Sequence, residues 1–287
     1  MNRRDFIRIA GISALFGVGG AAGIARLKHD DLLEAFEARP SDKGLKARHW
    51  AMVIDVSKFR GPEDYQKCID ACHNAHNVPD IGNQKEEVKW LWKDGFEHSF
   101  PGMEHKYMPE GFEHGQFLLL CNHCENPPCV RACPTKATFK RKSDGIVMQD
   151  MHRCIGCRFC MAACPFGARS FNFRDPRLFI KAENENKRFP TRTKGVVEKC
   201  TFCYERLAEG LMPACVEAAK ETKALVFGDL DDPQSEVREI LKTHYTIRRK
   251  PELGTSPSIY YVIAPAGGMA PAEGKGLGSP SKGGEHA

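Results

Sequence analysis

The chain has 287 residues, which is enough for one large domain or two ordinary ones. Hydrophobic residues make up 41% and charged residues 28%, which is typical of a globular protein and excludes one with several membrane spans. The net charge is only +5 and the basic residues are scattered, so we expect no nucleic-acid partner.

Residues 1–27 have the pattern of an export signal. Arg3 and Arg4 precede an uncharged, apolar stretch that runs from Ile9 to Ala25. A short amphipathic helix or a membrane span are the alternatives, but the stretch is shorter than the roughly twenty residues that cross a bilayer. Paired arginines at this junction favour the twin-arginine route. We therefore expect the protein at the periplasmic, extracytoplasmic face of the membrane, either peripheral or anchored by an uncleaved signal.

The thirteen cysteines lie in four islands, numbered here in chain order. Residues 48–79 begin with a strand expected in "HWAMVIDVSKF" and contain island one, with Cys68 and Cys72. Residues 80–117 have no cysteine but include Trp90 and Trp92. We predict that they form an insertion loop, either a surface that docks a partner or a packed excursion.

Residues 118–194 contain islands two and three, after a strand expected in "FLLL". Island three, "CIGCRFCMAACP", follows the C-x2-C-x2-C-x3-C-P spacing of bacterial two-cluster ferredoxins, whose fourth cysteine ligates the other cluster. Island two, "CNHCENPPCVRACP", has a similar spacing, and Asp144-Gly145 between the islands predicts a hairpin of two short strands. Reciprocal ligation then predicts two [4Fe-4S] clusters: cluster 1 with Cys121, Cys124, Cys129 and Cys164, and cluster 2 with Cys154, Cys157, Cys160 and Cys133.

Residues 195–263 contain island four, in which Cys200, Cys203 and Cys215 follow C-x2-C-x11-C. Ala219 stands where a fourth cysteine would complete the pattern. In island one, the stretch "DVSKFRGPEDYQ" before Cys68 contains no cysteine either. The same reciprocal rule predicts one further cluster, cluster 3, held by Cys72, Cys200, Cys203 and Cys215. Cys68 is left over, as a buried small side chain or as a ligand in an unusual site.

The remaining segments complete the predicted fold. Strands are expected in "KALVFGDL" and "SIYYVIA", a helix in "QSEVREILKTH", and a disordered tail over residues 264–287. Because islands one and four must meet to share a cluster, we predict an α+β fold of two nested, bacterial-ferredoxin-like modules with short hairpins and helices around the clusters. The outer module comprises residues 48–79 and 195–263, and the inner module comprises residues 118–194.

Clustered cysteines can also serve other chemistry. Zinc and disulfides are alternatives, but two four-cysteine runs that each end in Cys-Pro favour iron–sulfur clusters. No C-x-x-C is followed by histidine, so a covalently attached haem is excluded, and no pattern of a catalytic site is present. His123, inside island two, is expected beside the cluster sulfurs, whereas His73 and His76 are expected in a solvated loop.

The motifs together resemble a known family. "CNHCENPPCVRACPTKAT", "GIVMQDMHRCIGCRFCMAACPFGAR", "EKCTFCYERL" and "ALVFGDLDDPQSEV" look like the tandem iron–sulfur electron-transfer subunits of the polysulfide and dimethyl sulfoxide reductase family. Members usually carry four clusters, and this chain departs by losing ligands from the outer pair. With three clusters it is most similar to the iron–sulfur subunits of the membrane complex linked to dissimilatory sulfite reduction and of a related haem-containing menaquinol-oxidising complex.

The resemblance implies a function and partners. It implies electron relay in sulfate or sulfite respiration, with no bond chemistry in this chain. It implies an integral membrane, quinone-interacting subunit on one side and a multihaem cytochrome or other redox subunit on the other. The alternative is the electron-transfer subunit of a molybdopterin oxidoreductase of the polysulfide, dimethyl sulfoxide or formate type.

Overall fold

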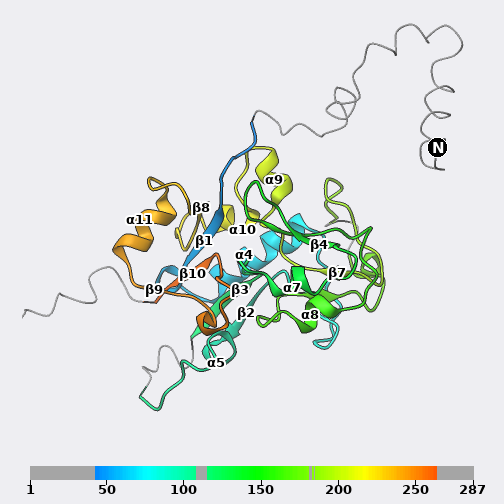
Figure 1. Cartoon of the computed structure of the whole chain (residues 1–287), viewed down its shortest axis with the longest axis horizontal. Coiled ribbons are helices and arrows are strands. Elements are labelled where there is room, and N and C mark those ends of the chain that lie inside the picture. The colour runs from blue at the N-terminus through cyan, green and yellow to red at the C-terminus, as the bar shows by residue number, and fades with distance from the viewer. Residues whose placement is uncertain (1–42, 108–114, 181–182, 184, 264–287) are drawn as a thin grey trace, which may run out of the picture. The chain divides into compact units, whose positions relative to one another are not determined.

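A computed structural model describes residues 43–107, 115–180, 183 and 185–263 (Figure 1). The predicted export signal and the predicted C-terminal tail lie outside the described residues. Within the described ranges, no helix is long and apolar enough to cross a membrane.

A four-stranded sheet in the order β8-β1-β10-β9 anchors the chain on both sides of the cysteine islands (Figure 1). Its centre is β1 (Trp50–Asp55), every residue of which is buried. It pairs antiparallel with β8 (Leu225–Asp229) and parallel with β10 (Ile259–Val262), while β9 (Thr246–Ile247) closes the edge beside β10. Segments from the two ends of the described chain thus share one sheet.

One helix packs on this sheet, one 3-10 turn follows β1, and another lies between β9 and β10. Helix α11 (Glu236–Thr243) begins at Ser235, whose hydroxyl accepts a hydrogen bond from the backbone N–H of Arg238. Its buried Val237 packs with apolar side chains of β1, β8 and β10. The 3-10 turns are η1 (Val56–Lys58) and η4 (Pro251–Leu253). The predicted strands in "HWAMVIDVSKF", "KALVFGDL" and "SIYYVIA" and the predicted helix between the last two are all present.

Islands one and four meet, as sharing a cluster requires. Helix α4 (Pro62–Ala75) starts with a proline at its first position, where the missing N–H costs nothing, and carries both cysteines of island one. It packs against α10 (Ala214–Ala218) of island four. Along the chain, α9 (Tyr204–Ala208) follows the first two cysteines of island four and precedes α10.

Islands two and three are connected by the predicted hairpin. Island two follows β3 (Gln116–Leu120) and contains α7 (Pro128–Arg131), and island three contains α8 (Phe159–Ala162). The hairpin pairs β4 (Thr138–Lys140) with β5 (Val147–Gln149), and Gly145 has a φ of +76°, the left-handed conformation that glycine favours. Strands β6 (Ser170–Phe171) and β7 (Val197–Glu198) lie on either side of η2 (Pro176–Phe179) in the sequence and form a further two-stranded sheet that leads into island four.

Part of the predicted insertion loop, residues 88–100, packs into the core rather than forming a surface loop. Strand β2 (Leu91–Gly95) pairs with β3 over five residues, and α5 (Phe96–Ser99) follows it directly. Trp90, Phe96 and Phe100 are buried in the largest hydrophobic core. The docking of a partner by residues 80–117 stays a prediction.

Candidate functional site

Cysteines from islands two and three surround one cavity. Cys121 and Cys124 follow β3, Cys129 lies on α7, and Cys164 comes just after α8, where Pro165 turns the chain. All four line the cavity, together with Val147, Arg169 and other residues. Burial, and then the neighbouring Cys121, raises the pKa of the Cys124 thiol to about 12. A buried thiolate here requires a positive partner, such as cluster iron.

The other cysteines of islands two and three lie nearer the surface. Cys133, Cys154 and Cys157 are partly exposed, whereas Cys160 is buried on α8, which packs against α7. The sulfur of Cys133 accepts a hydrogen bond from the backbone N–H of Thr138 at 3.4 Å. Burial opposes the thiolate of Cys133, but this and other hydrogen bonds outweigh it and hold its pKa below the ordinary value.

A glycine shapes the island three loop. Gly156, between Cys154 and Cys157, has a φ of +69°, and a Cβ added there would lie 2.4 Å from the carbonyl oxygen of Gly195. The loop can therefore approach that backbone only because the residue has no side chain.

Cys72 lies with the three cysteines of island four. Burial raises the pKa of its thiol well above the ordinary value, and the next contributions come from Cys200, Cys203 and Cys215. Burial also raises the pKa of Cys200, to about 12. The structure therefore brings together the four cysteines predicted for cluster 3, although they come from opposite ends of the described chain.

Cys68 lies one turn before Cys72 on α4 and is only 1% exposed. Burial raises its thiol pKa to about 12, and the neighbours that shift it further are Asp64 and Lys67. Ala219, which occupies the position of the missing fourth cysteine, is in the same apolar core. This environment matches the interpretation of Cys68 as a buried small side chain.

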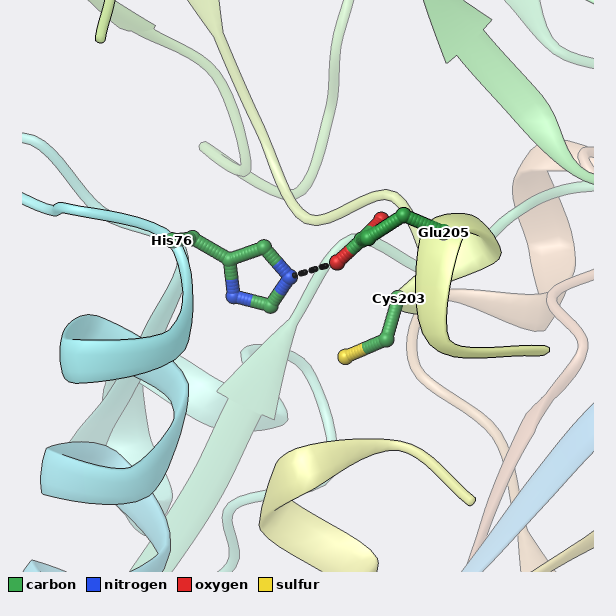
Figure 2. Close-up of side chains that lie close together, drawn as sticks. All are labelled: His76, Cys203 and Glu205. Carbon is green, nitrogen blue, oxygen red and sulfur yellow. Dashed lines mark hydrogen bonds and ion pairs between the residues drawn. The ribbon is translucent and has the colours of Figure 1, made fainter. Parts of the chain in front are cut away.

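His76 is buried beside the island four cysteines, in contrast to the solvated position expected from the sequence. Its Nδ1 donates to the backbone carbonyl of Cys72 at 2.8 Å, and its Nε2 lies 2.7 Å from Oε1 of Glu205 (Figure 2). The ring stacks on Trp90, with centroids 4.6 Å apart. Figure 2 shows the Cys203 sulfur pointing into the space below this pair, and side-chain atoms of the three residues lie within 4.8 Å of one another.

His123, which the sequence predicts beside the cluster sulfurs, packs against a residue of island four. Its ring stacks on Phe202 with centroids 3.7 Å apart, and its Nδ1 accepts a hydrogen bond from the backbone N–H of Val147. Burial first, and then the nearby Lys199 and Arg169, hold the pKa of His123 well below its usual range. The ring is therefore neutral, and Nε2 carries the proton.

Unpartnered polar atoms test whether a cluster fits the cavity. Two residues that line it have buried side-chain atoms with no hydrogen-bond partner within the described part of the chain: both amide atoms of Asn122 and Nη2 of Arg169. Buried polar groups are normally paired, and N–H donors to cluster sulfur are a usual way to tune such sites. Four thiols and unpaired donors around one cavity fit a [4Fe-4S] cluster.

Several buried charged residues were not identified from the sequence. Arg169 and Lys199 lie beside the cysteines, and Arg192 forms a buried ion pair with Glu198 at 2.6 Å. Glu198 also accepts a hydrogen bond from the indole N–H of Trp90 at 2.9 Å. Isolated arginines and lysines carry no spacing signal, so only their burial in the folded chain distinguishes them from surface residues.

Comparisons with known proteins agree with this arrangement. The 4Fe-4S dicluster domain family matches residues 114–178, which contain islands two and three. The Hdr-like menaquinol oxidoreductase iron-sulfur subunit 1 of Archaeoglobus fulgidus is 40% identical, over 91% of this chain and 97% of that protein. The iron-sulfur cluster-binding subunit of menaquinone reductase from Nitratidesulfovibrio vulgaris is 36% identical, over 74% of this chain and 88% of that protein.

A third relative has a different substrate in its name. Tetrathionate reductase of Salmonella typhimurium has a subunit that is 42% identical, over 77% of this chain and 74% of that protein. The matches to these relatives extend far beyond the two-cluster segment. The chain belongs to the family of ferredoxin-like iron–sulfur subunits that transfer electrons within oxidoreductase complexes.

Proposed function

We propose that the chain holds three [4Fe-4S] clusters in two nested modules and relays single electrons through them. Each cluster supplies one-electron redox chemistry, with a potential set by charge, hydrogen bonds and exposure. The proposed ligands are Cys121, Cys124, Cys129 and Cys164 for cluster 1, Cys154, Cys157, Cys160 and Cys133 for cluster 2, and Cys72, Cys200, Cys203 and Cys215 for cluster 3.

The observation that carries this proposal is the convergence of cysteines from separate islands. Cys164 joins three cysteines of island two around one cavity, and Cys72 joins three cysteines of island four. This is the reciprocal ligation of two-cluster ferredoxins, repeated once in an incomplete form. Helices α4 and α10 pack together although islands two and three lie between them in the sequence, which supports the nesting of the two modules.

The proposed partners follow from the relatives. Two of them are named for menaquinol or menaquinone chemistry, which supports an integral membrane, quinone-interacting partner. The other partner is a multihaem cytochrome or another redox subunit, within a complex of the sulfate or sulfite respiration type. The paired arginines Arg3 and Arg4 support export by the twin-arginine route and a site on the extracytoplasmic face of the membrane.

The alternative function is the electron-transfer subunit of a molybdopterin oxidoreductase. The similarity to a tetrathionate reductase subunit favours it, because the identity of 42% is comparable to the 40% of the menaquinol oxidoreductase subunit, over a smaller share of both chains. Purification of the native complex separates the two functions. A haem-containing partner supports the first function, and a large subunit with a molybdenum cofactor supports the second.

The cluster content is tested by measuring iron and acid-labile sulfide on anaerobically purified protein, with electron paramagnetic resonance (EPR) of the dithionite-reduced sample. We expect about twelve iron atoms per chain, because each of three clusters holds four. About sixteen would require a fourth cluster, about eight would leave the outer module empty, and stoichiometric zinc with little iron would refute electron transfer.

A further inference from the structure

Arg169 is a buried cation at the wall of the cluster 1 cavity. It is only 4% exposed and lines the cavity together with the four cysteines. Its Nη1 donates to the hydroxyl of Thr138 at 3.2 Å and to Oε1 of Gln149 at 3.0 Å, both uncharged acceptors. Its Nη2 has no partner among the described residues. The guanidinium also lies beside the thiol of Cys160, a proposed ligand of cluster 2, so it is close to the sulfurs of two clusters.

Lys199 is a second buried cation, placed between clusters 1 and 3. Its side chain is fully buried, and its Nζ donates to the carbonyl of Cys200 at 2.7 Å and to the carbonyl of Val147. Val147 lines the cluster 1 cavity, and Cys200 belongs to cluster 3. Neither Lys199 nor Arg169 forms an ion pair with a carboxylate in the described part of the chain.

The counter-charge for these cations comes from the cysteines. Burial opposes the charge on Arg169, but the neighbouring thiolates, Cys129 and Cys160 foremost, outweigh it and raise the arginine pKa. For Lys199 burial lowers the pKa, and Cys121 and Cys200 act in the opposite direction. A buried cation without a carboxylate is costly, so anionic clusters are the natural partners of both side chains.

The polar pair beside cluster 3 adds no such charge. The Nδ1 of His76 must donate to the carbonyl of Cys72, because a carbonyl cannot donate. The Nε2 of His76 lies 2.7 Å from Oε1 of Glu205, so this imidazole is paired with a carboxylate, unlike Arg169 and Lys199. Of Arg169 and Lys199, only Lys199 lies beside cluster 3, whereas both lie beside cluster 1.

We propose that Arg169 and Lys199 raise the reduction potential of cluster 1 above that of cluster 3, which makes cluster 1 the site where the electron rests between the two buried clusters. The physical reason is that reduction adds one negative charge to a cluster, and nearby positive charge stabilises the reduced form. This inference rests on the ligand sets proposed above. It identifies these two side chains as residues that set the direction of electron flow.

The test is an equilibrium redox titration of the whole protein, followed by low-temperature EPR. The signals are assigned with Cys124→Ala and Cys72→Ala, each of which removes the signal of one cluster. In the wild-type protein we expect cluster 1 to be reduced at a higher potential than cluster 3. In Arg169→Met we expect the reduction equilibrium constant of cluster 1 to fall at least tenfold, equal to about 59 mV, with no change at cluster 3.

Two further variants separate charge from structure. Arg169→Lys keeps the charge and should keep most of the potential. Arg174→Met removes an arginine that is 55% exposed and paired with Glu86, and should leave both potentials unchanged. Lys199→Met should lower the potentials of both clusters.

The outcomes distinguish this inference from the proposed function. If the wild-type protein holds about twelve irons but cluster 3 has the higher reduction potential, the inference is wrong while the proposed function stands. This result does not depend on whether any variant folds. An unchanged cluster 1 potential in Arg169→Met with full iron content also overturns it. A wild-type protein without these clusters refutes the proposed function itself.

Discussion

Replacing Cys72 by alanine should remove cluster 3 as a four-iron site, whereas the same change at Cys68 should not. Both cysteines are buried on α4, one turn apart, so the two variants make the same chemical change in the same helix. Cys72 has Cys200, Cys203 and Cys215 as its neighbours, whereas the neighbour of Cys68 among these three is Cys215. The pair of variants therefore tests the assignment of the fourth ligand with a matched control.

The expected magnitude follows from the ligand count. Cys72→Ala leaves three thiolates, so the site either loses the iron that lacks a ligand or loses the whole cluster. Iron content should fall from about twelve to between eight and eleven atoms per chain. Cys68→Ala removes one sulfur from a core and should cost about 1 kcal/mol, with iron unchanged at about twelve.

The assay is iron and sulfide analysis combined with EPR of the reduced protein, on samples purified in parallel without oxygen. Full iron content in Cys72→Ala, or loss of a cluster in Cys68→Ala, would refute the assignment. If the two variants exchanged their phenotypes, Cys68 would be the ligand and Cys72 the bystander.

Three further changes test the loops and the core. Gly156→Ala should lower iron content and the melting temperature, because its Cβ would meet the carbonyl oxygen of Gly195. Glu198→Gln leaves Arg192 buried without its counter-ion, so it should cost roughly 3–5 kcal/mol and lower Tm by roughly 6–20 °C in a thermal scan. Burial raises the pKa of the Tyr65 hydroxyl to about 12. The buried neutral tyrosine therefore contributes fully to stability below its unfolded pKa of 10.0, and this contribution is lost as the pH rises towards 12. Tyr65→Phe should therefore reduce the loss of Tm between pH 8 and alkaline pH.

Matched controls accompany these changes. Gly82 has a φ of +67°, close to that of Gly156, but nothing lies within 4 Å of a Cβ added there, so Gly82→Ala should leave iron content unchanged. Glu217→Gln breaks an ion pair whose glutamate is 48% exposed and should change Tm only slightly. A Tyr65→Phe protein that loses as much Tm at alkaline pH as the wild type would show that another group causes the loss.

The local part of the site was predictable from the sequence. The cysteine spacing of islands two and three indicated a two-cluster ferredoxin-like segment, and the 4Fe-4S dicluster family matches it. Short apolar runs correctly predicted the strands at Trp50–Asp55, Leu225–Asp229 and Ile259–Val262. These features depend on neighbouring residues and on strand periodicity, which a sequence displays directly.

Other features were decided by tertiary structure alone. The sequence suggested a solvated His76, but packing of α4 against island four buries its ring between Trp90 and Glu205. No pattern in the sequence indicates that Arg169 and Lys199 are interior cations rather than surface ones. Burial and charge partners depend on which distant segments pack together. Cysteine spacing therefore determines where clusters can bind, while the charge around each cluster is determined only when the chain is folded.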